Sequence, residues 1–176
     1  MTSRLHLSVL ALGLTLAAAG CGKDTPSAPT PPADPKFTAT LSPANETTAV
    51  VGGDVSGSGS VTMTMHPTKD AAGNVTAATA DFTVTLQGFP AGTVLTGAHI
   101  HPGASGVAGG VVWSLGLAAG EITLANGSGT FTKTAVAPAD VATAQQILNN
   151  PAGFYFNVHT TVNTGGAIRG QLVKTN

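Results

Sequence analysis

The chain has little charge and almost no cysteine. Lys and Arg number 7, Asp and Glu number 8, and a single Cys occurs among 176 residues. Without a basic excess the chain cannot neutralise many phosphates, so we expect no nucleic-acid partner. One Cys excludes a disulfide framework and a Cys-rich zinc module. The low net charge, together with 42% hydrophobic residues, also excludes charge-driven disorder.

Enzyme signatures are equally scarce. The sequence contains no phosphate-binding loop, dinucleotide fingerprint, nucleophile elbow or metalloprotease helix. Composition alone does not exclude a Ser/His/Asp triad, although no particular Ser is marked as a nucleophile. Gly, Thr, Val and Ala dominate instead, and Thr and Val suit the pleated surface of a sheet. We therefore expect a neutral, β-rich domain and favour a binding module over an enzyme.

The N-terminus has the pattern of a secretory signal. Arg4 precedes an uncharged apolar run over residues 7–19, which is shorter than the ~20 residues that a spanning helix needs. Small residues then lead directly into Cys21. This arrangement resembles the bacterial lipoprotein signal, in which the peptide is cut before a Cys that carries lipid on its sulfur. The resemblance implies that residues 1–20 are removed and that Cys21 becomes the membrane anchor.

The lipoprotein family favours Leu three residues before the Cys, and this chain has Ala18 there, a tolerated variant. The alternative is an ordinary signal peptide cut nearby, which would leave Cys21 as a free thiol. The two hypotheses differ in what they expect of the mature protein. The first expects a lipid anchor and the second expects a secreted domain with one reactive sulfur.

Residues 21–36 form a predicted linker. They contain five of the eleven prolines and no large apolar side chain, which is typical of an extended, solvated segment. At ~3.1 Å per residue in polyproline geometry, such a segment could hold a domain ~40 Å from a membrane. The lipid and the linker together predict a domain anchored to the cell envelope membrane and placed outside the cytoplasm, in the periplasm or at the cell surface.

Residues 37–176 have the pattern of one β domain. Alternating apolar residues and Gly-rich turns predict short strands over 37–41, 58–65, 77–86, 94–101, 110–115, 128–133, 154–160 and 167–173. A single helix is predicted over 138–149, with Val141, Ile147 and Leu148 packing inward. The predicted fold class is all-β: an immunoglobulin-like or Greek-key β-sandwich, or a small barrel, of about eight strands with one short helix.

Three of these strands carry polar side chains opposite their apolar face. The period of two along a strand separates the apolar residues, which should face the core, from the polar residues between them. If the three strands are neighbours in one sheet, the polar residues form one patch. Its members are His99, His101, Tyr155, Asn157, His159, Arg169 and Gln171.

The histidines of this patch are candidate metal ligands. Two His at positions i and i+2 of a strand can reach one ion, and a third from a neighbouring strand completes a set of three imidazoles. Imidazole suits Cu and Zn, so His99, His101 and His159 form a hypothetical Cu or Zn site. The alternative is a purely structural network, in which the same His residues with Asn157 and Arg169 tie the strands together through hydrogen bonds.

Two motifs carry a family resemblance. The first is Ala-His-Ile-His-x-Gly at 98–103 with Gly-Gly-Val-Val at 109–112, and the second runs from Phe-Tyr-Phe-Asn-Val-His-Thr at 154–160 to Ile-Arg-Gly-Gln-Leu at 168–172. Together they resemble the CHRD (chordin) domain, found in chordin and in many bacterial extracellular proteins. The resemblance implies an immunoglobulin-like β domain. The family usually has an acidic residue after the Gly-Gly pair that precedes the last motif, where this chain has Ala167.

The sequence leaves three functions open. The first, implied by the family resemblance, is a tethered binding module for a protein or small-molecule ligand. The second is a Cu or Zn protein, because the strand with His99 and His101 is locally similar to the copper-binding segment of Cu/Zn superoxide dismutases. The zinc loop and paired cysteines of the dismutases are not present in this chain. The third is the structural network.

Overall fold

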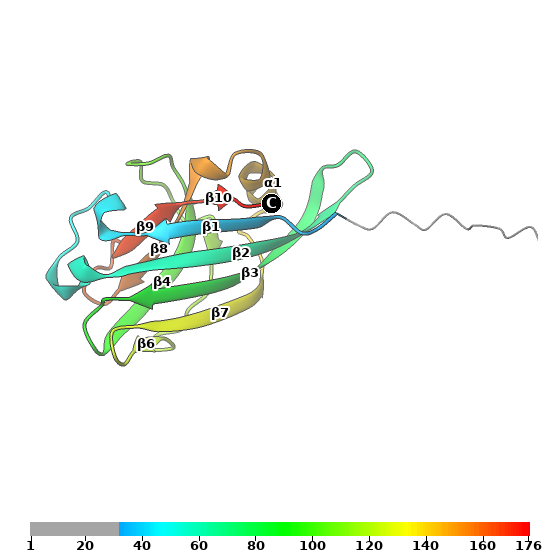
Figure 1. Ribbon diagram of the computed structural model, residues 1–176. Helices are drawn as coiled ribbons and strands as arrows, with labels where there is room; N and C mark the ends of the chain where they lie inside the picture. The colour runs from blue at the N-terminus through cyan, green and yellow to red at the C-terminus, as the bar shows by residue number, and fades with distance from the viewer. Residues whose placement is uncertain (1–31) are drawn as a thin grey trace, which may run out of the picture. The chain divides into compact units, whose positions relative to one another are not determined.

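The computed structural model describes residues 32–176, so the predicted signal peptide, Cys21 and most of the linker lie outside the described residues. Two antiparallel sheets pack against each other and enclose one core (Figure 1). No helix within the described range is both long and apolar enough to cross a membrane.

The first sheet has the strand order β10-β1-β2-β3-β7. Its strands are β1 (Lys36–Leu41), β2 (Ser58–Lys69), β3 (Val75–Gln87), β7 (Gly129–Val136) and β10 (Val173–Lys174). The long β2–β3 hairpin turns at Asp70, whose carboxylate accepts hydrogen bonds from the backbone N–H groups of Ala72 and Asn74, both at 2.9 Å. This is the hairpin loop that the sequence predicts between residues 69 and 74.

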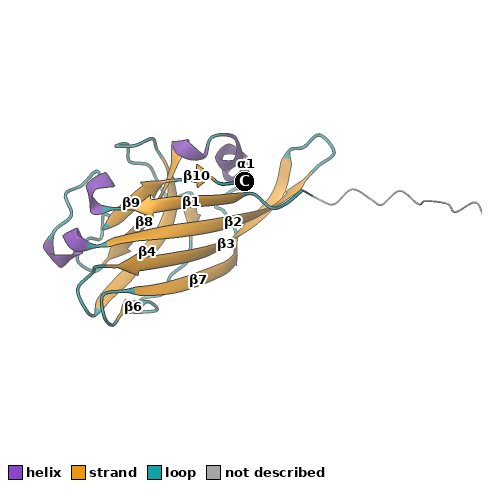
Figure 2. Ribbon diagram, in the orientation of Figure 1, coloured by secondary structure: helices purple, strands orange, loops and turns teal. Residues whose placement is uncertain are grey.

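The second sheet has the order β5-β4-β8-β9, and β6 also pairs with β4. Its strands are β4 (Thr93–Pro102), β5 (Trp113–Ser114), β6 (Thr123–Leu124), β8 (Phe154–Thr160) and β9 (Ile168–Gln171). The three strands that carry the polar patch are therefore neighbours. Figure 2 shows this sheet lying behind the first one.

The core lies between the inner faces of the two sheets. Alternate residues of β3 and β8 are fully buried there, and Phe82 contacts both Trp113 (ring centroids 6.0 Å apart, edge to face) and Phe156 (6.2 Å apart, stacked). At one corner the sheets are joined by a pair of backbone hydrogen bonds between Ser42 and Arg169, at 3.1 and 3.2 Å. The predicted all-β sandwich is confirmed. Residues 32–176 form ten strands, and the two beyond the predicted eight, β6 and β10, contain only two residues each.

The helix is shorter than the sequence predicts. Helix α1 spans Val141–Asn149, and the Asp140 carboxylate caps its N-terminus by accepting a hydrogen bond from the Thr143 backbone N–H at 2.8 Å. Ile147 is buried as expected, but the prediction that Val141 packs inward is wrong, because its side chain is 37% exposed. The Asp140 cap fixes where the helix starts, and this start directs the first helical residue, Val141, toward solvent.

The described residues also include three short 3₁₀ turns: η1 (Pro43–Asn45), η2 (Gly52–Ser56) and η3 (Pro151–Gly153).

The predicted strand over 110–115 is mostly wrong. Only Trp113–Ser114 forms a strand, and residues 103–112 form a loop. Two glycines shape this loop. Gly106 has a φ of 78°, which favours glycine, and a Cβ on Gly109 would lie 1.9 Å from the Pro102 carbonyl oxygen. The loop thus returns closely over the end of β4 instead of extending as a strand.

Candidate functional site

The polar patch lies on the outer face of the second sheet, opposite the core. The register explains why its members meet: His99 on β4 pairs with Asn157 on β8, and Asn157 pairs with Arg169 on β9. The next row contains His101, Tyr155 and Gln171. The structure therefore brings all seven predicted residues together. Because side chains alternate along each strand, residues in these two rows must share one face.

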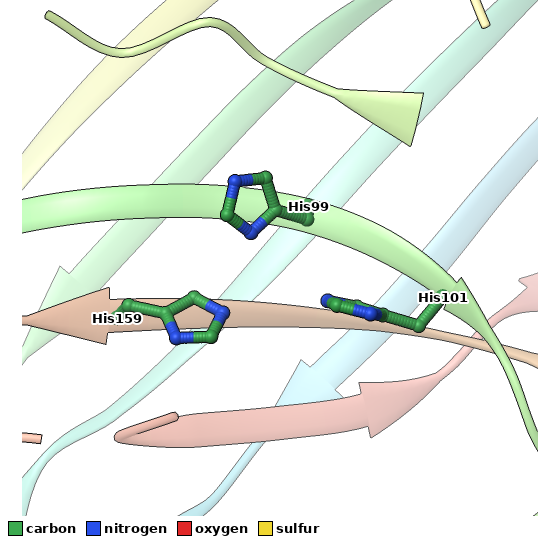
Figure 3. Close-up of side chains that lie close together, drawn as sticks. All are labelled: His99, His101 and His159. Carbon is green, nitrogen blue, oxygen red and sulfur yellow. The ribbon is translucent and has the colours of Figure 1, made fainter. Parts of the chain in front are cut away.

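Three imidazoles converge in the centre of this patch. We call His99, His101 and His159 the histidine cluster. One ring nitrogen from each can be chosen so that all three lie within 4.8 Å of one another. The ring centroids are 5.0 Å apart for His99 and His159, and 5.7 Å apart for His99 and His101. Figure 3 shows His99 and His101 projecting from β4 toward the ring of His159 on β8.

Backbone carbonyls orient two members of the cluster. The Nδ1 atom of His101 lies 2.9 Å from the Gly109 carbonyl oxygen, and Nδ1 of His159 lies 2.9 Å from the Thr164 carbonyl oxygen. A carbonyl only accepts, so each Nδ1 carries the hydrogen and donates it. The Nε2 atoms are then free of hydrogen in the neutral rings. Metal-binding His residues usually have this arrangement, because the second hydrogen bond fixes the tautomer and the ring orientation.

His99 has a different environment. Its Nδ1 atom is buried and has no hydrogen-bond partner among the described residues. Burial, together with the neighbouring His159 and His101, lowers the pKa of His99 to about 4, so the ring is neutral at pH 7. Burial also lowers the pKa of His159. A neutral imidazole with a lone pair available is the form in which His binds a metal ion.

A glycine makes room for the His99 ring. Gly97 lies two residues before His99 on the same face of β4, directly across from His159. A Cβ at this position would lie 2.5 Å from Cε1 of His99. Real side chains do not tolerate such a contact, so any other residue would displace the ring from its place beside His159. Gly97 therefore leaves the space in which the His99 ring lies beside His159.

Arg169, Tyr155 and His101 form a three-layer stack beside the cluster. The Tyr155 ring is parallel to the His101 ring, with centroids 4.9 Å apart and planes 7° apart. The Arg169 guanidinium carbon lies 3.5 Å from the centre of the Tyr155 ring on a cation–π contact. The same guanidinium donates a hydrogen bond to the Val107 carbonyl oxygen at 3.1 Å. This stack fixes the orientation of the His101 ring beside His99 and His159.

Most of the patch is covered by another segment of the chain and is not displayed to solvent. Tyr155 is 4%, Asn157 3% and Arg169 1% exposed. The loop over residues 103–112 lies across them, and its backbone accepts hydrogen bonds from Arg169 and from the Gln171 amide, the latter to Gly103 at 2.9 Å. The sequence could not show this cover, because the loop carries no side-chain signal beyond its glycines.

Glu46 is the residue of the site that sequence reasoning missed. It is the C-cap residue of η1, and Arg169 and Asn157 both act on its carboxyl group. Burial raises the pKa of Glu46 to about 7, while Arg169 and Asn157 act in the opposite direction. No donor of the described residues comes within hydrogen-bonding distance of its Oε1 atom, which is buried. The sequence offered one signal for it. Arg169 is the single Arg of residues 37–176, and a buried Arg usually has a carboxylate nearby.

A second buried carboxylate explains the role of Asn163. Asp54 in η2 is 1% exposed and accepts hydrogen bonds from Thr160 Oγ1 at 2.6 Å and from Asn163 Nδ2 at 2.8 Å. The Asn163 side chain also accepts a hydrogen bond from the Val51 backbone N–H and donates one to the Val51 carbonyl oxygen. These bonds fasten the loop after β8 to the segment before β2, so Asn163 is structural and does not face the histidine cluster.

The comparison with protein families agrees with the two motifs. The family described as CHRD domain matches residues 37–172, from the first residues of β1 to the end of β9. The chain belongs to the CHRD domain family. The domain is, in general terms, a binding or interaction module. Neither the curated proteins nor the solved structures yielded a match to the chain.

The CHRD motifs now have a structural meaning. The His-Ile-His motif places His99 and His101 on the outer face and Ile100 in the core, and the β8 motif does the same with Asn157 and His159 around Val158. The arrangement can hold one small cation between three imidazoles. By contrast, His66 lies on the first sheet, where its ring nitrogens bond the carboxylates of Asp34 and Asp81 at 2.7 and 3.1 Å.

Proposed function

We propose that this CHRD-domain protein is a lipid-tethered domain outside the cytoplasm whose histidine cluster binds one Zn²⁺ or Cu²⁺ ion. The observation that carries the metal proposal is the convergence of three ring nitrogens within 4.8 Å. Around one ion with metal–nitrogen bonds of 2.0–2.1 Å, such nitrogens lie ~3.3 Å apart. Side-chain rotations that move each ring nitrogen by about 1 Å would therefore bring the three nitrogens to bonding distance from one ion.

The surroundings of the cluster support the same proposal. The Nδ1–H groups of His101 and His159 donate to backbone carbonyls, and His99 keeps a buried nitrogen that has no hydrogen-bond partner within residues 32–176. A purely structural network would be expected to satisfy its buried polar atoms. The unsatisfied nitrogen of His99 therefore favours a metal ion over the structural network.

Metal content tests this proposal directly. The protein should be purified without an affinity tag as the Cys21→Ser variant, so that neither a His tag nor the thiol can bind metal. We expect about one equivalent of Zn or Cu per chain by mass spectrometry, or one equivalent on titration of the chelator-treated protein. Failure to bind either ion, by a protein that is folded by circular dichroism, would leave the structural network as the explanation.

The tether is proposed from the sequence, because Cys21 lies outside the described residues. A short apolar segment, small residues before Cys21 and a Pro-rich linker support it. One lipidated residue with two or three acyl chains anchors a protein far more firmly than a single chain. Through the domain, the anchored protein would present its metal site to a protein or small-molecule ligand at the envelope.

Replacing Cys21 with Ser should abolish lipidation. In a bacterial host grown with an alkyne-labelled fatty acid, we expect the wild-type chain to be labelled and to partition into detergent. The Cys21→Ser chain should carry no label and should no longer partition into the detergent phase, because Ser offers no sulfur for the lipid. Equal labelling of the two chains would contradict the anchor at this position.

A further inference from the structure

His66 ties the end of the predicted linker to the first sheet. Its Nδ1 atom lies 2.7 Å from Oδ2 of Asp34, which precedes β1, and its Nε2 atom lies 3.1 Å from Oδ2 of Asp81 on β3. The ring thus bridges two carboxylates that come from separate parts of the chain. We call Asp34, His66 and Asp81 the linker clasp. It belongs to the first sheet, whereas the histidine cluster belongs to the second.

The hydrogen bonds of the linker clasp require a protonated ring. Either oxygen of an ionised carboxylate is an acceptor, so the ring must be the donor in both bonds. A neutral imidazole has one N–H group and would direct a lone pair at the second carboxylate, whereas an imidazolium has two N–H groups and satisfies both. The same contacts raise the pKa of His66, first through the hydrogen bond to Asp34 and then through the one to Asp81.

The two carboxylates are held differently. Oδ1 of Asp81 also accepts a hydrogen bond from the Ala135 backbone N–H on β7 at 2.9 Å, and this bond, followed by the one from His66, lowers the pKa of Asp81. The Asp34 carboxylate has the His66 ring as its one partner within residues 32–176. Lys36 lies on the neighbouring β1, but the charges that act on the His66 ring are those of Asp34 and Asp81.

The segment held by His66 is the junction between the linker and the domain. The Pro35 carbonyl oxygen accepts a hydrogen bond from the Met65 backbone N–H at 2.9 Å, and the Asp34 carbonyl oxygen accepts one from Nδ2 of Asn176 at 3.1 Å. Figure 1 shows β1 starting beside the base of the β2–β3 hairpin, with the C-terminus nearby. Within residues 32–176, Asp34 is the first residue of the chain that is hydrogen-bonded to the domain.

We propose that the linker clasp is a pH-dependent device, in which the His66 imidazolium fastens Asp34 to Asp81 and deprotonation releases Asp34. Asp81 stays in place because β7 also holds it, so the neutral ring keeps its single hydrogen on Nε2. Asp34 then faces the lone pair on Nδ1 and moves into solvent. The clasp is therefore closed while His66 is protonated and both carboxylates are ionised, and it opens as the pH rises through the pKa of His66 in the folded protein.

A closed clasp would fix the direction in which the linker leaves the domain. Residues 21–36 contain five prolines, and a Pro-rich segment acts as a semi-rigid spacer. Such a spacer, fastened at its end, would hold the domain in one orientation relative to its anchor, whereas an open clasp would let the domain rotate. The clasp itself needs no lipid, and this consequence alone rests on the proposed anchor at Cys21.

Nuclear magnetic resonance titration of the His Cε1 protons in the Cys21→Ser chain tests the bridge. We expect a pKa for His66 above the ordinary value of 6.5. Asp34→Asn and Asp81→Asn should each lower it, because each removes a negative charge and frees the side chain to turn its NH₂ group to the ring. Asp140→Asn makes the same change at the α1 cap, where Asn serves as well as Asp, and should leave the His66 pKa unchanged. A parent pKa at or below the ordinary value would overturn the proposal.

A nitroxide spin label at residue 33 tests the release. In the chain with Cys21→Ser and Ala33→Cys, the label is attached to the single cysteine, next to Asp34. We expect slow label motion at about pH 5.5, where Asp carboxylates are still ionised, and faster motion at about pH 9. The change should follow the His66 titration and should disappear on adding His66→Gln, because an amide does not titrate in this range.

Label motion that is the same at both pH values in the parent would overturn the release of Asp34. A pH dependence that survives His66→Gln would assign the change to another group and would also overturn the proposal. Each of these chains lacks Cys21, so a failure of the clasp and a failure of the lipid anchor are separate results.

Discussion

Replacing His99 and His101 together with Ala is expected to weaken Zn²⁺ and Cu²⁺ binding at least about 100-fold, since two of the three imidazole ligands are lost. The remaining imidazole of His159 would bind no better than a surface histidine. Metal titration of the chelator-treated protein, in the Cys21→Ser background, measures the change. His101 is 6% exposed and bonded at both ring nitrogens, so the variant also tests how far the pair supports the fold.

The control for this experiment is His66→Ala. His66 belongs to the first sheet and has its own carboxylate partners, Asp34 and Asp81. Its removal should leave metal affinity unchanged. Denaturant unfolding of the metal-free chains completes the comparison. A double variant that unfolds more easily while the parent binds no metal would favour the structural network, and a double variant that binds metal as tightly as the parent would place the site elsewhere.

Replacing Arg169 with Leu is expected to lower the free energy of unfolding by about 3–5 kcal/mol, because the change removes a buried charge and leaves its partners behind. Arg169 is 1% exposed, stacks on Tyr155 and donates to the carbonyl oxygens of Val107 and Ala104 at 3.1 and 3.4 Å. Without it the loop over residues 103–112 loses its main attachment, and the half-buried carboxyl group of Glu46 loses its nearest cation.

Urea unfolding of the metal-free protein measures this effect without a contribution from bound metal. Arg169→Lys keeps the charge but not the planar group that stacks on Tyr155, so we expect an intermediate loss of stability. Adding Glu46→Gln to Arg169→Leu should restore part of the loss, because it removes a half-buried ionisable group that no longer has a cation beside it. A loss below about 1 kcal/mol for Arg169→Leu would show that the stack and the loop bonds contribute little.

The strand pattern was enough to predict the two faces of the second sheet. Ile100 and Val158 are buried in the core, and His99 and His159 lie on the other face, as the period of two requires. The β8 strand begins and ends where the alternation predicts, at Phe154 and Thr160. These features are local, because each depends only on neighbouring residues in one strand.

The errors occur where distant segments decide the conformation. Residues 110–112 have the apolar character of a strand but lie in a loop whose course follows the close approach of Gly109 to Pro102. The contribution of Glu46 was invisible because its segment, after η1, has no strand or helix period that would place it beside β8. The start of α1 depended on which of several polar residues became the cap, and Asp140 took that position.

The sequence by itself determined the low charge, the all-β class, the face of each strand and the polar residues that could form a site, because alternation and composition are properties of local chain. The tertiary structure decided that β4, β8 and β9 are neighbours in a register that sets His99 against Asn157 and Asn157 against Arg169. It also decided that a loop covers this face and that Glu46 reaches it. Register and cover depend on packing between segments far apart in the chain, and no local pattern encodes the distances that bring three imidazoles together.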